Sequence, residues 1–196
     1  MNTKSLAISI LLAVVAMVLN PGVTGIRIPS PFLTGLYYQV WDIPIIVVFL
    51  LLGFRYGLFS SVLNGFFLFA VFPGPSQWLY APGNVAALLS MMVGIWFARK
   101  LLVKPVSAES AVVGRFSGGK VTAFSTLFGI LVRVPVMMPI MFLILRYGYY
   151  APDVYTFAVL PVHALYCVVM AVYTIPAAYL IARAVNRSFK IGNQID

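Results

Sequence analysis

One apolar stretch, residues 125–146, constrains this chain more than any other. It is long enough to cross a bilayer, yet it contains Arg133, and the nearest charges on either side, Lys120 and Arg146, are each thirteen positions away. At a rise of about 1.5 Å per residue, both lie about 20 Å from Arg133 along a helix, which places Arg133 near the membrane midplane. Because a guanidinium at that depth costs about 3 kcal/mol or more, its side chain must face protein or a wet cavity.

The composition is typical of a polytopic membrane protein. Of the 196 residues, 62% are hydrophobic and only 9% are charged, which is more apolar surface than a soluble domain can bury. The length allows one compact bundle, so we interpret residues 1–196 as a single transmembrane domain. The net charge is +9, but the basic residues fall in short segments between apolar runs. They form no patch interleaved with exposed aromatic residues, which argues against nucleic acid as a partner.

Six apolar spans follow one another along the chain. Their expected limits are residues 5–20, 37–55, 57–72, 84–103, 125–146 and 156–184. Small residues recur at every fourth position on the third and fourth spans, which predicts close helix–helix contacts there: Gly57, Ser61 and Gly65, then Ala86, Ser90, Gly94 and Ala98. The sequence therefore predicts an all-α polytopic membrane bundle of six transmembrane helices.

The basic residues predict the orientation of the bundle. With six spans, both termini lie on one side, and that side carries ten of the 13 Lys and Arg residues. Arg27 and Arg146 lie on the other side, and Arg133 lies within the membrane. The positive-inside rule therefore places both termini in the cytoplasm, and we expect a multi-pass protein of the cell membrane.

The first span has a second interpretation. A lone Lys4 precedes a short apolar run, and residues 23–25 (Val-Thr-Gly) resemble a cleavage site, so the run could be a cleaved signal peptide. Pro21 and Gly22 end the run as they would end a helix, and the run is about long enough to span the bilayer. We therefore favour a retained helix.

Asp42 is the one carboxylate expected at membrane depth, since the other three lie in loops or at the C-terminus. If its helix is centred near Ile46, Asp42 lies about 6 Å to the outer side of the midplane, within reach of Arg133. The two side chains could pair directly or through a ligand. Alternatively, Asp42 only caps a helix that has Pro44 in its first turn, and Arg133 forms a static ion pair that fixes helix packing. The cost of a charge at the midplane favours a functional Arg133.

Two further polar residues are candidates for a site in the outer half of the bundle. Asn84 begins the fourth span directly after Pro82 and Gly83. A helix start with free amides can bind a polar or anionic group, or Asn84 can simply be the N-cap. His163 is the only histidine and lies near the outer end of the sixth span, where it is either a ligand contact or a hydrogen-bonded core residue.

Aromatic residues gather at the outer ends of the spans and in the outer loops. The five are Tyr37, Tyr38, Trp41, Trp78 and Tyr80. Such residues commonly anchor a protein at the membrane interface. Beside the loop at residues 73–83, which is rich in Gly and Pro, they could also form a lid that stacks on a flat heterocycle.

The sequence holds no constellation typical of an enzyme. The single histidine and Cys167 have no acidic neighbour for a metal site, and there is no acid pair, Ser–His pair or phosphate-binding glycine loop. Cys167 lies in an apolar run, as an inert buried thiol does. We expect no catalysis, no metal and no cofactor, so any uphill transport must draw its energy from another chain or from an ion gradient.

These features together resemble the substrate-binding S component of energy-coupling factor (ECF) transporters, and most closely the riboflavin-transporter-like family. The resemblance covers nearly the whole chain. It rests on the order and spacing of residues 12–19 (Leu-Ala-Val-Val-Ala-Met-Val-Leu), Asp42-Ile-Pro44 followed by Gly53 and Gly57, Pro82-Gly-Asn84, and Gly129-Ile-Leu-Val-Arg133. In the first span, Ser9 and Ala13 stand where the family has a small-residue motif for docking onto a partner.

The resemblance implies a subunit that captures a vitamin, riboflavin as a first guess, from outside the cell. It implies delivery through an ATP-driven complex with a transmembrane T subunit and cytoplasmic ATPase subunits. By position, the substrate would be bound by Tyr38, Trp41, Asp42, Trp78, Tyr80, Asn84, Arg133 and His163.

Two other classes of protein fit the same pattern. One is a membrane scaffold or assembly protein, in which Arg133 pairs statically and no ligand binds. The other is a stand-alone carrier of small solutes, against which the lack of an inverted repeat in the sequence counts.

Overall fold

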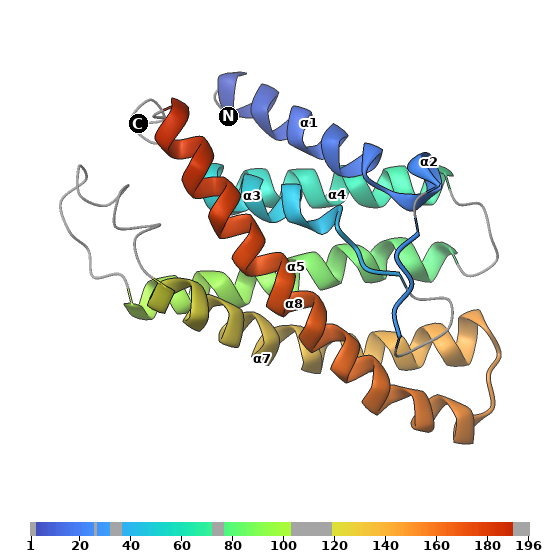
Figure 1. Cartoon of the computed structure of the whole chain (residues 1–196). Coiled ribbons are helices and arrows are strands. Elements are labelled where there is room, and N and C mark those ends of the chain that lie inside the picture. The colour runs from blue at the N-terminus through green and yellow to red at the C-terminus, as the bar shows by residue number, and fades with distance from the viewer. Residues whose placement is uncertain (1–2, 26, 32–36, 72–76, 103–118, 190–196) are drawn as a thin grey trace.

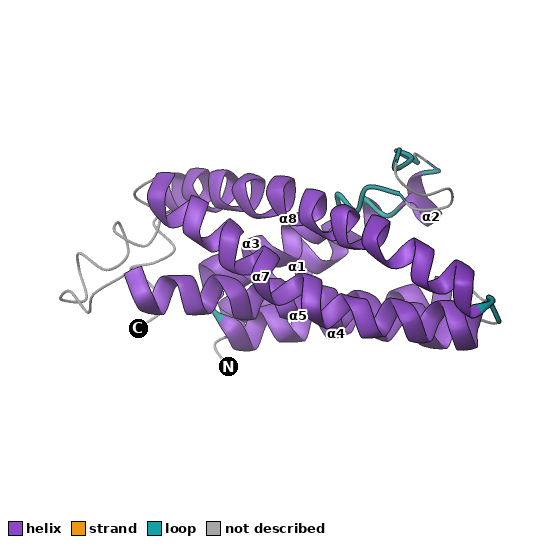
Figure 2. Cartoon of the chain, turned by 90° about the horizontal axis from the view of Figure 1, so that it is seen from below, coloured by secondary structure: helices purple, strands orange, loops and turns teal. Residues whose placement is uncertain are grey.

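The computed structural model describes residues 3–25, 27–31, 37–71, 77–102 and 119–189. Over these residues the chain is helical, and the one strand-like pairing is an isolated bridge between Pro29 and Tyr37. Figure 2 shows the bundle from below, with helices making up most of the described chain. The all-α prediction is therefore confirmed for the described part of the chain.

Helices α4, α5 and α7 run roughly alongside one another, α8 crosses the bundle obliquely, and α1 begins at the same end at which α8 ends (Figure 1). Their bounds are α1 (Thr3–Val18), α2 (Pro21–Thr24), α3 (Asp42–Leu52), α4 (Phe54–Val71), α5 (Gln77–Leu102), α7 (Gly119–Leu143), a π-helical turn η1 (Ile144–Gly148) and α8 (Asp153–Phe189). Four of the described helices, α4, α5, α7 together with η1, and α8, are long and apolar enough to cross a membrane. These four helices indicate a membrane-embedded protein.

The two remaining long apolar segments form shorter helices than expected. Helix α1 has 16 residues and α3 has 11, so both are shorter than the four helices that are long enough to cross a membrane. The predicted limits of the first, third, fifth and sixth spans agree with α1, α4, α7 and α8 to within a turn or two. The second and fourth spans end within a turn of their predicted limits, but α3 starts later and α5 starts earlier than predicted.

Helix α3 covers only the middle of the span predicted at residues 37–55. Pro44 lies in its first turn and has no N–H to offer the carbonyl group of Val40, so the helix does not extend further back. It ends at Gly53, whose φ of 92° is a conformation that residues with a Cβ rarely adopt. Its 11 residues measure about 16 Å, half of a hydrocarbon core of about 30 Å. A helix of this length is too short to cross the hydrocarbon core by itself.

Helix α5 begins at Gln77, a full two turns before the predicted start at Asn84. Pro82 lies inside it, near its N-terminal end, where a proline disturbs few hydrogen bonds. The prediction of a loop at residues 73–83 is wrong from Gln77 onward, and residues 72–76 lie outside the described part of the chain. Asn84 is consequently an interior helical residue instead of an N-cap.

Glycines allow the helices of the bundle to approach closely, as the small-residue spacing predicts. A Cβ at Gly57 would lie 2.7 Å from Cβ of Phe49 on α3, and a Cβ at Gly94 would overlap the backbone carbonyl group of Phe128 on α7. These contacts confirm that small residues of α4 and α5 face neighbouring helices.

The main apolar core lies where α3, α5 and α8 meet. Its fully buried members include Ile45, Ile46, Leu88, Met91, Met92, Ile95, Ile175 and Ala178. Residues 44–50 of α3 are all buried, which explains why this helix is apolar on every side. The core therefore surrounds the helix whose first residue is Asp42.

The approach of α5 to α7 gives a test of the fold. We expect Gly94→Ala to destabilise the protein by about 1–3 kcal/mol, because the added methyl meets backbone that cannot move aside. Gly119→Ala is the matched control, since a Cβ there has nothing within 4 Å. Thermal unfolding in detergent checks both, and equal melting temperatures for the two variants would contradict the close packing.

Candidate functional site

The site is centred on an ion pair between the middle of α7 and the start of α3. Nη1 of Arg133 lies 4.0 Å from Oδ2 of Asp42, and the exposed fractions of the two side chains are 2% and 0%. The same Nη1 donates a hydrogen bond of 2.9 Å to Sδ of Met91 on α5. The contact predicted between Asp42 and Arg133 is confirmed. At 4.0 Å the pair is an electrostatic contact and not a hydrogen bond.

Asp42 does not cap its helix through its side chain. The N-cap of α3 is Trp41, which makes no capping bond with its side chain. Both carboxylate oxygens of Asp42 are buried and accept no hydrogen bond from any described residue. The carboxylate lies at the N-terminus of α3, the positive end of the helix dipole. A negative charge is more favourable there than further along the helix.

A small cavity opens beside the Arg133 side chain. It measures about 60 Å³ and is lined by Gln39, Tyr80, Gly83, Asn84, Ala87, Arg133, Met137, Met141, Ile144, His163, Tyr166 and Cys167. Typical small-molecule pockets begin at about 300 Å³. In this conformation the cavity is large enough for water molecules and too small for a vitamin.

Polar atoms without partners gather around this cavity. Within the described residues, ten buried side-chain nitrogen or oxygen atoms have no hydrogen-bond partner. Six of the ten belong to three cavity residues and to the partner of Arg133: Oε1 of Gln39, both oxygens of Asp42, Nε of Arg133 and both ring nitrogens of His163. Because most buried polar atoms in proteins have a partner, the cluster indicates a place where polar groups from outside the chain bind.

Asn84 and His163 reach this cavity from different helices. Asn84 accepts a hydrogen bond of 3.0 Å from Nδ2 of Asn64, so α4 holds its side chain in place. His163 on α8 is 4% exposed, and its ring lies 5.7 Å from the ring of Tyr166. Since neither ring nitrogen is hydrogen-bonded to a described residue, His163 is not a satisfied core histidine. Cys167 is a buried free thiol, as predicted.

The aromatic residues expected to form a lid do not stay together. Tyr80 lines the cavity, but the exposed fraction of Trp78 is 55%, and Trp78 is not among the residues that line it. Trp41 is buried in the main core, and Tyr38 packs edge to face against Tyr173 of α8. Because α5 starts early, Trp78 and Tyr80 lie on a helix, where residues two apart point in different directions.

Several residues of the site could not be found from the sequence. Tyr149, in the loop after η1, donates a hydrogen bond of 2.9 Å to the hydroxyl group of Tyr80, and their rings meet edge to face. Tyr166 donates to the backbone carbonyl group of Tyr37 at 2.7 Å. Gln39 lines the cavity three residues before Asp42. For Tyr166 the sequence does carry a signal: it lies three positions after His163 on α8, so the two side chains lie on the same face of the helix.

Backbone without regular structure leads into the site. Between Tyr37 and the start of α3 the chain forms no helix: the N–H of Tyr38 donates to the carbonyl group of Ile28, and that of Asp42 donates to the carbonyl group of Gln39 in a turn. Inside a membrane, such backbone is tolerated only where protein buries it or where it lines a cavity. Here the irregular backbone leads to the first residue of α3, next to the cavity beside Arg133.

Ser9 and Ala13 lie inside the protein and not on its surface. Both are fully buried, and Ser60 of α4 donates a hydrogen bond of 3.3 Å to the backbone carbonyl group of Ser9. A partner helix could reach them only if α1 moved away from α4. The face of α1 that is exposed carries larger apolar residues, such as Leu11 and Val18.

Comparisons of the chain with protein-family models, with curated proteins and with solved structures found no match. In the described part of the chain, no group of three or more His, Cys, Asp or Glu side chains could hold a metal ion. The chemistry that the arrangement offers is binding. Arg133 donates, Asp42 accepts, and Asn84 and His163 can do both.

The buried pair predicts an asymmetry between its two partners. We expect Asp42→Asn to destabilise the protein by about 3–5 kcal/mol, because it leaves a buried guanidinium without its counter-charge. Arg133→Met removes the charge and keeps most of the stem volume, and the carboxyl group that remains can take up a proton. We therefore expect it to melt close to the parent protein, or above it.

Asp153→Asn is the control for this comparison. Asp153 pairs with Arg146, but the two side chains are 61% and 43% exposed, so the loss should not exceed about 1 kcal/mol. Thermal unfolding in detergent measures all three variants together with the double variant Asp42→Asn/Arg133→Met. If the double variant melts no higher than Asp42→Asn, the two side chains are not energetically coupled.

Proposed function

We propose that this protein is a membrane-embedded binding subunit that captures a small polar organic solute at the Arg133 cavity. In the family it resembles, that role belongs to the S component of an ECF transporter, and a vitamin of the riboflavin type is the first candidate substrate. The observation that carries the proposal is a cluster of six unpartnered polar atoms, four on residues that line one cavity and two on Asp42 beside Arg133. Such a cluster is costly unless something binds to it.

The kind of solute follows from the groups that face the cavity. A cationic donor, an amide and an imidazole lie together with aliphatic and thioether side chains such as Met137 and Met141. This mixture suits a compound with an apolar body and an edge rich in hydrogen-bonding groups, as vitamins with a heterocyclic ring have. Asp42 adds an acceptor that a ligand can reach by separating it from Arg133, because the present contact is long.

The cavity must widen before such a solute can enter. Its volume of about 60 Å³ is closed on one side by Tyr80, whose hydroxyl group is held by Tyr149. The next residue, Tyr150, has a φ of 54°, a left-handed conformation that is uncommon outside glycine. Breaking the contact between Tyr80 and Tyr149 would let the Tyr80 ring move, while the hydrogen bonds of Ala151 and the Arg146–Asp153 pair still hold the loop after η1.

The proposal extends to location and partners. The subunit lies in the cell membrane with both termini in the cytoplasm, as the distribution of basic residues favours. It has no catalytic activity of its own, and a transmembrane T subunit with cytoplasmic ATPase subunits supplies the energy for transport. Since Ser9 and Ala13 are buried, the partner would meet the exposed apolar face of α1 or another face of the bundle.

A scaffold without a ligand is the second candidate. The observation in its favour is that Asp42 and Arg133 are already in contact and that the cavity beside them is small. In that case the polar cluster would only fix how α3, α5, α7 and α8 pack. The two candidates differ in whether any solute binds when the cluster is intact.

Binding to the purified protein tests the proposal. We expect a flavin or another vitamin to co-purify, or to quench tryptophan fluorescence when added from a panel of flavin, thiamine, biotin, folate and cobalamin. Arg133→Met should weaken that binding by about 2 kcal/mol or more, the scale of a lost charge-assisted hydrogen bond. Arg55→Met is the control, because Arg55 is exposed at the start of α4.

Two outcomes would overturn the proposal. One is the absence of binding and of a co-purified compound across the whole panel, with a parent protein that melts cooperatively. The other is a vitamin that binds Arg133→Met as tightly as it binds the parent, which would place its site elsewhere.

The tyrosine contact predicts a change in rates. Tyr149→Phe removes the hydroxyl donor to Tyr80, so the bound vitamin should enter and leave several-fold faster, with a smaller change in affinity. Tyr150→Phe is the matched control, since Tyr150 is 83% exposed and keeps its backbone conformation. Stopped-flow fluorescence measures both rates. Equal rates in the two variants would show that the contact does not limit entry.

A further inference from the structure

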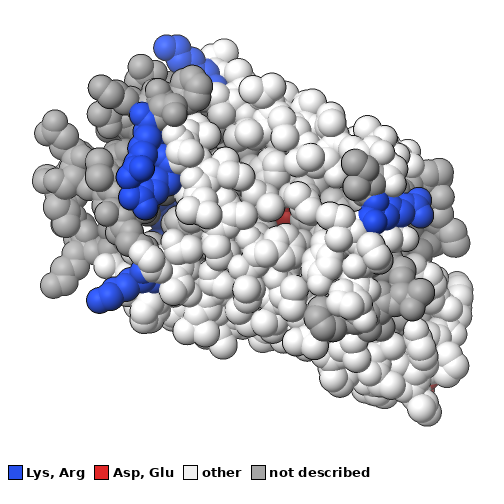
Figure 3. Space-filling model, in the orientation of Figure 1, with Lys and Arg blue, Asp and Glu red and all other residues white. Residues whose placement is uncertain are grey.

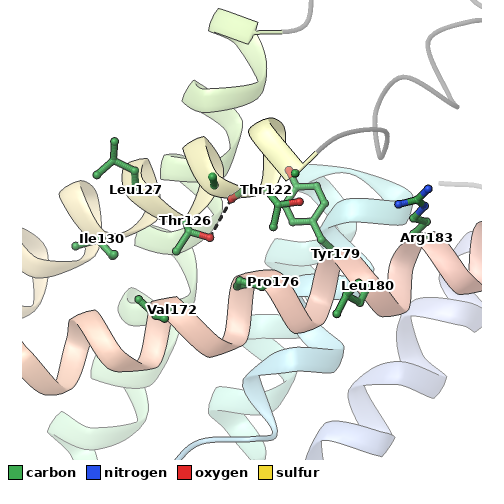
Figure 4. A pocket seen from close by; sticks show the side chains of 11 residues that line it. Thr122, Thr126, Leu127, Ile130, Val172, Pro176, Tyr179, Leu180 and Arg183 are labelled. Carbon is green, nitrogen blue, oxygen red and sulfur yellow. Dashed lines mark hydrogen bonds between the residues drawn. The ribbon is translucent and has the colours of Figure 1, made fainter.

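A second hollow lies on the outside of the bundle, between α7 and α8 (Figure 4). This groove measures about 650 Å³ and is lined by Gly119, Thr122, Ala123, Thr126, Leu127, Ile130, Val172, Pro176, Tyr179, Leu180 and Arg183. It shares no lining residue with the Arg133 cavity. Several of its apolar side chains are exposed, Leu180 by 69% and Leu127 and Val172 by 50% each.

The groove is polar at one end and apolar at the other. Thr122, Tyr179 and Arg183 lie at one end, while Leu127, Ile130 and Val172 lie at the other (Figure 4). The hydroxyl groups of Tyr179 and Ser125 are hydrogen-bonded to each other at 2.9 Å, which fixes the tyrosine ring in the wall. The groove therefore has the polarity of an amphiphile, with a head at one end and a tail at the other.

The length of the groove matches one leaflet of a bilayer. Arg183 and Val172 are eleven positions apart on α8, or about 16 Å along the helix axis. Half of a hydrocarbon core is about 15 Å. The apolar end at Ile130 lies one turn from Arg133, which the sequence places at the midplane. The groove thus runs from the membrane surface to about mid-depth, as a single acyl chain does.

The charge at the polar end favours an anionic occupant. Basic residues gather at one end of the molecule (Figure 3), where α5 and α8 end and α7 begins: Arg99, Lys100, Lys120, Arg183 and Arg187. The two carboxylates of the described residues lie elsewhere, Asp42 paired with Arg133 and Asp153 paired with Arg146. No described carboxylate is therefore available at that end to neutralise Arg183.

We propose that the groove between α7 and α8 binds one phospholipid with an anionic headgroup. The phosphate lies at Arg183, and one acyl chain lies against Leu127, Ile130, Val172 and Leu180. The guanidinium can donate two parallel hydrogen bonds to phosphate oxygens. A choline headgroup carries a positive charge of its own, which would repel the guanidinium and weaken this attraction. The site is independent of any solute at Arg133, so it does not depend on the function proposed above.

Lipid binding to the purified protein in detergent tests this site. Native mass spectrometry compares phosphatidylglycerol with phosphatidylcholine of the same acyl chains. We expect phosphatidylglycerol to bind with one tight site, and Arg183→Gln to weaken that site about tenfold, the scale of a lost charge-assisted contact. Arg187→Gln is the matched control, one turn further along α8, exposed and outside the groove. It should leave the tight site unchanged.

A second pair of variants tests the apolar end. Leu127→Trp fills the groove where the acyl chain would lie and should weaken phosphatidylglycerol binding, whereas Leu131→Trp, on an exposed part of α7 outside the groove, should not.

Equal loss in Arg183→Gln and Arg187→Gln would mean diffuse attraction to a basic surface. Displacement of the lipid by glycerol phosphate would mean that only the headgroup is recognised. Equal affinity for the two lipids would remove the requirement for an anion. Each of these results would overturn the proposal.

Discussion

A guanidinium in the middle of an apolar bundle needs a counter-charge, and the arrangement of α3 supplies it. Asp42 is the first residue of α3, so its carboxylate lies beside Arg133 at the positive end of the helix dipole. Pro44 and Gly53 set the two ends of this short helix, and Gly57 lets α4 return closely against it. The fold of this region therefore depends on placing one acidic side chain at the depth of one basic side chain.

The stability of the bundle comes from elsewhere. A buried ion pair contributes little net stability, because desolvation of the two charges offsets their attraction. The apolar side chains of α3, α5 and α8 around Ile46, Met91 and Ile175 are fully buried and supply the main driving force for packing. An apolar pair in place of Asp42 and Arg133 would serve packing at least as well. That the chain instead places unpartnered polar atoms there argues for a role in binding.

Features that depend on the spacing of residues along the chain could be predicted from the sequence. The distance of Arg133 from other charges predicted its depth. The small residues that recur every fourth position, in one row with Gly57 and in another with Gly94, predicted close helix contacts. The features missed depend on how segments meet. The apolar run through α3 looks like a full span, and only the φ of Gly53 and the missing N–H of Pro44 divide it. Similarly, neither the burial of Ser9 against α4 nor the contact of Tyr149 with Tyr80 has a signal in the sequence, because each joins distant parts of the chain.

Arg133 and Arg183 differ in which groups can neutralise their charge, because their surroundings differ. Arg133 is enclosed by helices, so its charge must be met by residues of the chain itself or by a solute small enough to enter between them. Arg183 is exposed at the mouth of an open apolar groove, so its charge can be met by the membrane. Both α7 and α8 contribute to each place, with Arg133 and His163 at the buried cavity and Thr122 and Arg183 at the basic end of the groove. A change in how these two helices pack would therefore alter both places at once.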